Sequence, residues 1–304
     1  MGKTVSVITI NGLLFSLLVC SAGCAEAPTS EAIPAASTSK TGTLLRIEPL
    51  QAPLKFHIVR NERTLMNNVP QYKKNMDLSF DLTIKRVSGD DYQIKPSNGD
   101  GIDLERKQSN HLKKMTALIS KEILSITIGE KGAATDPQFS RANDTGWAGA
   151  IALKAFGQFE HGFLDTMLPD DKIEPGAKWF RDVDFAEEAK LSDANASELF
   201  PNIKRSIRFD QTGSRAEYTL VKTESVGGRQ IAEISYNSSG TVKVESQHSL
   251  MGDASYQQEI TEKGTIKLDA KTGWPVEFKM VRTVDTKSAT NPSIEESTTI
   301  VKRI

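Results

Sequence analysis

Residues 76–84 read MDLSFDLTI, in which apolar and polar side chains alternate at every position. Because successive side chains of a β-strand point to opposite faces of the sheet, this pattern predicts a strand with one buried face and one wet face. Sheets that are buried on one side only are typically antiparallel. The segment therefore indicates an antiparallel sheet as the main element of the fold.

Shorter segments on both sides of this strand have the same period. Apolar residues alternate with polar ones at Leu54, Phe56 and Ile58, at Leu124, Ile126 and Ile128, at Ile266 and Leu268, and at Val276, Phe278 and Met280. In the later segments Lys267, Glu277 and Lys279 occupy the intervening positions, where we expect them to face water.

Turn signals separate these segments. They read SGDD at 88–91, GEKG at 129–132, VGGR at 226–229 and DAKTG at 269–273. Glycine supplies the backbone conformations that tight hairpins need, so each signal predicts a local hairpin. We therefore expect a mainly β fold with a single curved antiparallel meander sheet, shaped like half of a barrel.

One stretch follows a helical period instead. Its apolar residues recur every four positions, at Trp147, Ile151, Ala155, Phe159 and Phe163. This spacing predicts an amphipathic helix over about 146–166, which makes the fold class α+β. We expect the helix to pack on the concave face of the sheet. A weaker acidic stretch, 186–199, reads as a loop or a short helix.

The N-terminus has the order of an export signal. Lys3 precedes an apolar stretch, and the small residues Ser21, Ala22 and Gly23 follow it. The uninterrupted apolar run, 13–20, is much shorter than the roughly 20 residues of a membrane-spanning helix. We expect residues 1–23 to be a removed signal peptide.

Residues 21–24 read SAGC and resemble the lipobox of bacterial lipoproteins, although Ser21 stands where a leucine is commoner. The resemblance implies that Cys24 becomes a lipidated first residue and attaches the chain to a membrane. The alternative is cleavage by an ordinary signal peptidase, for instance after Ala27. Residues 24–42 would then form the anchor and a flexible tether, because their Ala-, Ser-, Thr- and Pro-rich composition cannot bury a core. Residues 43–304 would form one β-rich domain.

Composition excludes several classes of protein. The chain has 38 Lys and Arg against 39 Asp and Glu, without the basic excess typical of nucleic-acid binding. Its two cysteines, Cys20 and Cys24, precede the body, which therefore holds neither a disulfide nor a thiolate metal site. No histidine lies in a His-Glu-x-x-His motif, and no Gly-x-Ser-x-Gly elbow is present. We expect no cofactor, no metal and no catalytic residues.

Three weaker signals have structural alternatives. Glu160, His161 and Asp165 could hold a metal, but a cluster near a helix end is the more common explanation. Residues 96–107 are rich in calcium-type oxygen ligands, yet Pro96 and Lys107 stand where an EF-hand loop needs acids. We interpret them as a polar turn between strands. The sequons at 143–145, 195–197 and 237–239 are interpreted as loop sequence.

Aromatic residues beside turn glycines admit two interpretations. Trp179 follows Gly176 closely, and Trp274 follows Gly273. They could stack on a ligand, but such residues more often plug the ends of a sheet core. We interpret both as structural.

The second half of the chain resembles a family of bacterial secreted proteins and lipoproteins with no assigned function. The motifs are LP at 168–169, IEPG at 173–176, Trp179, and a final hairpin, GTIKLDAKTGWP, at 264–275. The resemblance implies a curved antiparallel sheet with helical cover and no catalytic residues. Half-barrels around a helix also occur in carriers that shuttle lipoproteins across the periplasm, an analogy of fold alone.

These observations predict an exported, membrane-anchored envelope lipoprotein without enzymatic activity. Its concave sheet face would bind an apolar ligand or an envelope protein. If the helix fills that face completely, no ligand site exists. The alternatives are an envelope hydrolase acting on glycan or peptide, with acids or a Ser/His pair gathered in a cleft, and a structural surface component.

Overall fold

The computed structural model describes residues 42–66, 73–103, 123–139, 168–186, 205–248, 252–289 and 292–304. Those residues form a single antiparallel sheet of 11 strands and include no helix. The predicted mainly β, antiparallel fold is therefore confirmed. The helix predicted over 146–166 lies outside the described residues, and so does the stretch 187–199.

Eleven strands succeed one another along the chain. The first five are β1 (Leu54–Met66), β2 (Lys73–Ser88), β3 (Asp91–Asp103), β4 (Leu124–Ile128) and β5 (Ala134–Phe139). The others are β6 (Lys178–Asp182), β7 (Arg205–Val226), β8 (Arg229–His248), β9 (Gly252–Asp269), β10 (Pro275–Ser288) and β11 (Ser293–Arg303).

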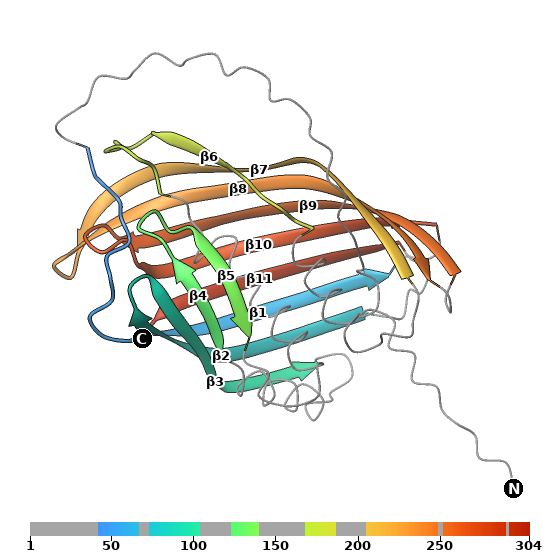
Figure 1. The fold of residues 1–304 in the computed structure, drawn as a ribbon, viewed down its shortest axis with the longest axis horizontal. Coiled ribbons are helices and arrows are strands. Elements are labelled where there is room, and N and C mark those ends of the chain that lie inside the picture. The colour runs from blue at the N-terminus through green and yellow to red at the C-terminus, as the bar shows by residue number, and fades with distance from the viewer. Residues whose placement is uncertain are drawn as a thin grey trace, which may run out of the picture.

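The sheet consists of two meanders joined in the middle. Its order is β5-β4-β3-β2-β1-β11-β10-β9-β8-β7-β6, so each meander runs between neighbours in sequence. The join is the pairing of the first strand with the last, from Phe56 opposite Arg303 to Met66 opposite Ser293. The two outer strands, β5 and β6, are the edges of a curved, open sheet (Figure 1).

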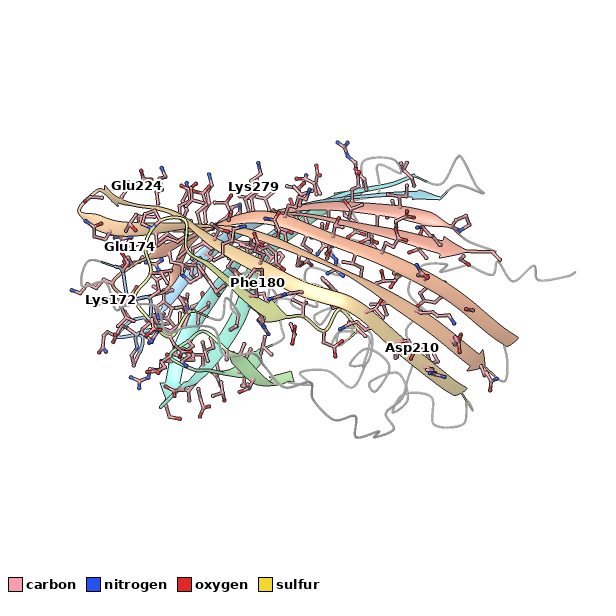
Figure 2. All side chains as sticks on the ribbon, turned by 90° about the horizontal axis from the view of Figure 1, so that it is seen from above. Lys172, Glu174, Phe180, Asp210, Glu224 and Lys279 are labelled. Carbon is pink, nitrogen blue, oxygen red and sulfur yellow. The ribbon has the colours of Figure 1, made fainter. Side chains whose placement is uncertain are left out.

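The inner face of the sheet carries the apolar side chains that the alternation predicts. One row of directly opposed residues crosses seven strands: Leu220, Ile234, Ile266, Phe278, Val301, Ile58 and Phe80. All seven are buried. The outer face points to water, as Lys279 does in Figure 2. Leu82 and Ile84 of the 76–84 segment are buried too, which confirms that prediction.

The four predicted turns are present. Gly227 and Gly228 form a two-residue turn with φ angles of 57° and 79°, which suits a tight hairpin between right-twisted strands. Gly273 also has a positive φ, 70°, in the β9–β10 turn. Glycine adopts these positive φ angles without strain, so the turns can be predicted from the glycines in the sequence.

One predicted turn is wrong. Residues 96–103 belong to strand β3, which runs without interruption from Asp91 to Asp103. The register shifts where Asp81 pairs with Ser97 but Ser79 pairs with Asp100, and Asn98 has a φ of 52°. The polar, glycine-containing segment therefore accommodates a β-bulge inside a strand.

Sequence around Asn237 was also misread as a loop. Asn237 lies within β8, directly opposite Glu217 of β7, and its side chain is exposed. The sequons at Asn143 and Asn195 lie outside the described residues.

One end of the sheet is closed by the segment 42–50. Its backbone bonds to three connections: Thr43 to Ile173, Ile47 to Glu130, and Glu48 to Thr272. The Trp274 indole donates to the Glu48 carbonyl at 2.7 Å and lies edge-on to Tyr92, with ring centroids 5.3 Å apart. Trp274 is 2% exposed, so it plugs this end as predicted. We call it the closed end.

Candidate functional site

Six polar side chains form the candidate site on the inner face of the sheet. We call them the inner polar belt: Arg60, Glu62, Tyr236, Ser238, Glu262 and Arg282. All are buried, and the four charged residues are at most 7% exposed. Buried charges are rare unless they are paired, so this cluster is the clearest departure from an ordinary apolar core among the described residues.

Strand alternation carries these residues inward. On β1, Phe56, Ile58, Arg60 and Glu62 are every second residue and share the inner face. On β10, Phe278, Met280, Arg282 and Val284 do the same. The register then aligns Glu62, Ser297, Arg282, Glu262 and Ser238 in one row across β1, β11, β10, β9 and β8.

Glu262 is the centre of the belt. It lies 3.6 Å from Arg282, between Oε1 and Nη1. Its Oε2 accepts a hydrogen bond from Ser238 Oγ at 2.8 Å and another from the Tyr236 hydroxyl. Burial raises the pKa of Tyr236 above its usual value, and the negative charge of Glu262 raises it further. The phenol therefore remains a neutral donor to the carboxylate.

Arg60 and Glu62 form a second buried ion pair at 3.2 Å, between Nη2 and Oε2. Among the described residues, Arg60 Nε has no hydrogen-bond partner. A buried ion pair recovers its desolvation penalty only when further hydrogen bonds complete it, so the belt is a weak source of stability for its cost. Such an arrangement is better explained by recognition or by orientation of side chains than by stabilisation of the sheet.

An aromatic row leads from the sheet edge to the belt. Trp179, Tyr218 and Tyr236 are directly opposite one another on β6, β7 and β8. The Trp179 and Tyr218 rings stack with centroids 5.5 Å apart and planes 10° apart, and Tyr218 lies 5.2 Å from Tyr236. Trp179 packs against the core, in agreement with its structural interpretation.

The inner face is divided along the strands. Toward the closed end from Arg60 lies the apolar row that includes Ile58, Val301 and Phe278. The belt residues occupy the next two rows: Arg60 and Tyr236 in the first, and Glu62, Arg282, Glu262 and Ser238 in the second. This face therefore offers apolar surface and buried charge side by side.

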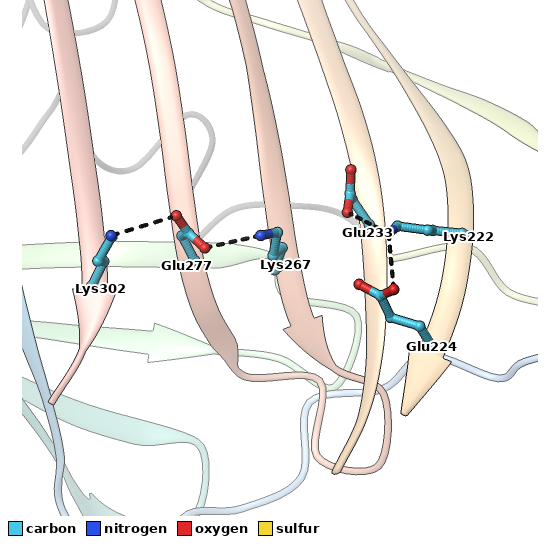
Figure 3. Close-up of polar contacts among 6 residues, drawn as sticks. All are labelled: Lys222, Glu224, Glu233, Lys267, Glu277 and Lys302. Atoms are coloured by element: carbon cyan, nitrogen blue, oxygen red, sulfur yellow. Dashed lines mark hydrogen bonds and ion pairs between the residues drawn. The ribbon is translucent and has the colours of Figure 1, made fainter. Parts of the chain in front are cut away.

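The outer face is polar in a different way. Lys302, Glu277 and Lys267 alternate in charge across three strands, with Lys267 3.0 Å from Glu277 (Figure 3). Lys222 contacts Glu224 and Glu233 in the same manner. These pairs are solvent-exposed, so each contributes little to stability. They are typical of a wet sheet face and assemble no site.

Most of the residues singled out from sequence lie elsewhere. Cys24, and the Glu160, His161 and Asp165 cluster, are outside the described residues. His57 lies on the outer face, where its Nδ1 is 2.7 Å from Asp81 Oδ1. Asn98, from the 96–107 segment that was interpreted as a polar turn, donates to Asp81 at 2.7 Å.

The part of the chain that the structure describes contains no group of three or more His, Cys, Asp or Glu side chains that could hold a metal ion. The same segments contain no helix that is long and apolar enough to cross a membrane.

The belt was missed in the sequence, although a signal was present. Arg60, Glu62, Glu262 and Arg282 occupy inner positions of alternating strands, and continuing the alternation through them would have predicted buried charge. The two acids among them, Glu62 and Glu262, come from separate strands, as a hydrolase would require. However, β11 and β10 separate Glu62 from Glu262, which puts their backbones about 14 Å apart at ordinary strand spacing. Each carboxylate is moreover paired with its own arginine, Glu62 with Arg60 and Glu262 with Arg282, so the arrangement does not favour a pair of carboxyl groups that act together on one substrate.

No protein-family model matches the sequence, and no curated protein matches it either.

Proposed function

We propose that this chain is a non-catalytic envelope lipoprotein that is anchored through Cys24 and holds an amphiphilic ligand against the inner face of its sheet. The observation that carries the proposal is the division of that face into an apolar region and a belt of buried charge. An apolar tail would lie along the row of Ile58 and Phe278, and a polar head would meet the belt.

The geometry of the sheet supports this assignment. An open, curved sheet presents one concave face, and ligand sites in proteins are mostly apolar concavities with a few placed polar groups. Arg60 has a guanidinium nitrogen, Nε, that finds no hydrogen-bond partner in the described part of the chain and could donate to an acidic head group. The closed end, with Trp274, fixes one limit of the site. An envelope protein that presents an apolar segment is the alternative occupant.

Lipidation is tested by intact mass measurement and metabolic lipid labelling beside a Cys24→Ala variant. The proposal expects a label that the variant loses. An unlabelled wild-type chain cut at another position would refute the anchor, and the ligand proposal would then apply to an unanchored exported protein.

Ligand binding is tested on the Cys24→Ala chain, which needs no detergent. Brominated fatty acids quench tryptophan that they approach. We expect saturable quenching that falls in a Trp179→Phe variant, since Trp179 heads the aromatic row leading to the belt. Quenching should persist in Trp274→Phe, because Trp274 belongs to the closed end. The absence of saturable quenching would contradict the proposal.

A further inference from the structure

Among the residues that the structure describes, strand β6 is an edge of the sheet. It pairs with β7 on one side, and it is the last strand in the sheet order. Three of its five side chains, Lys178, Phe180 and Asp182, are exposed on the outer side. Phe180 is 47% exposed, which is unusual for a phenylalanine on the wet face (Figure 2). An edge with such a side chain is available for pairing with another strand.

The backbone of β6 has a defined direction of hydrogen bonding. Val183 donates to Ser214 of the β7 segment at 3.1 Å, and Ala177 accepts from Leu220 at 3.0 Å. In an antiparallel ladder every second residue faces the same neighbour, so residues 179 and 181 also bond toward β7. The N–H and C=O groups of Lys178, Phe180 and Asp182 therefore point away from the sheet.

The sequence of β6 is complementary to itself. It reads KWFRD, and two antiparallel copies centred on Phe180 would place Lys178 of each copy opposite Asp182 of the other. Phe180 would face its own counterpart. Opposite charges directly across a strand pair are stabilising, and so are paired aromatic rings. Lys178, Phe180 and Asp182 thus supply both the complementary side chains and the backbone groups that point away from the edge of the sheet.

Neighbouring β7 residues hold the pairing side chains in place. The Arg215 guanidinium lies over the Phe180 ring, with 3.9 Å from Cζ to the ring centroid. Lys178 Nζ is 2.9 Å from Glu217 Oε1. Both side chains are thus oriented on the outer side before any partner arrives, which lowers the entropy lost on association.

The other edge carries a proline. Strand β5 reads ATDPQF, and Pro137 has no N–H to donate to a further strand. Proline on an edge is one of the devices by which proteins prevent edge pairing. The asymmetry between the two edges singles out β6.

We propose that β6 pairs with β6 of a second copy of this chain, forming a two-fold symmetric dimer with one continuous sheet. A two-fold axis through Phe180 makes the same surface serve both copies, as in most homodimers. The contact is only five residues long, so the dimer is weak and depends on concentration. This inference is independent of the proposed ligand and of lipidation.

Disulfide trapping tests the register. The variant would carry Phe180→Cys on a chain whose two natural cysteines are replaced by serine. A hydrogen-bonded antiparallel pair has Cα atoms about 5.5 Å apart, within the range for a disulfide. Mild oxidation should convert most of the protein to a covalent dimer. The matched control is Val281→Cys on β10, which is 43% exposed but lies inside the sheet, and it should remain monomeric.

Charge reversal provides the second test, measured by sedimentation of the same cysteine-free chain over a range of concentrations. Lys178→Asp should weaken the dimer about tenfold or more, because it places like charges opposite each other twice. The double variant Lys178→Asp with Asp182→Lys should recover dimerisation, since the pairs are exchanged but complementary. Equal trapping at positions 180 and 281, or a double variant as weak as the single one, would overturn the proposal. A chain that stays monomeric at every concentration would overturn it as well.

Discussion

Arg282 lies directly opposite Glu262 in the β9–β10 ladder, and both side chains are more than nine-tenths buried. The two charges sit 3.6 Å apart on the inner face, where water does not screen them. Ion pairs on the inner face therefore differ from those on the outer face, such as Lys267 with Glu277, which are exposed to water.

Glu262→Ala should lower the free energy of unfolding by about 3–5 kcal/mol, because it removes one member of a buried ion pair and the acceptor for Tyr236 and Ser238. Glu277→Ala is the matched control on the outer face, where Glu277 pairs with Lys267, and should cost about 1 kcal/mol or less. Urea unfolding followed by circular dichroism measures both. Equal losses would show that burial of the belt has no energetic consequence.

Tyr236 should stay protonated in alkaline solution for as long as the protein is folded. Burial, and then the Glu262 charge, raises the pKa of Tyr236 in the folded state. Burial likewise raises the pKa of Tyr92. The unfolded chain therefore releases these protons first, near pH 10, and stability is lost as the pH rises above that value. Absorbance at 295 nm should show the last tyrosines ionising together with unfolding, and an early, complete titration would contradict this.

Asp81→Asn should flatten the acid limb of the stability curve. Hydrogen bonds from Asn98 and then from His57 hold the pKa of Asp81 below its ordinary value of 3.8. The stabilisation is therefore present above about pH 4 and is lost as the pH falls through the folded-state pKa. Thermal unfolding between pH 2.5 and 6 measures the effect. If the wild-type and variant curves run parallel, the hydrogen bonds do not stabilise the ionised carboxylate.

Gly273→Ala should destabilise the closed end strongly. Gly273 has a positive φ, and an added Cβ would collide with the backbone of Arg46 in the 42–50 segment. Gly227→Ala meets nothing within 4 Å and is the matched control, with an expected cost of about 1–2 kcal/mol for its left-handed conformation. The Gly273 variant should lose at least about 1 kcal/mol more, because backbone must also move. Hydrogen exchange at residues 43–48 should rise in that variant alone, and unchanged protection would refute the contact.

Local features of this fold were readable from the sequence because they depend on neighbours in the chain. Alternation in 76–84 identified β2, and Gly227 with Gly228 identified a hairpin turn. The β-bulge at Asn98 was misread as a turn, since a polar, glycine-containing run looks the same in both cases. Trp274 was correctly assigned to the end of the core from its place beside a turn glycine.

The sequence by itself determined the period of the strands and the positions of the hairpins, and the prediction for Cys24 rests on sequence alone. Only the tertiary structure decided that β1 pairs with β11, because that contact joins residues more than 200 positions apart and no local signal encodes it. The same long-range register brings Arg282 beside Glu262 and leaves β6 at an edge. Side-chain period fixes which face a residue occupies, whereas the order of strands fixes which residues share that face as neighbours.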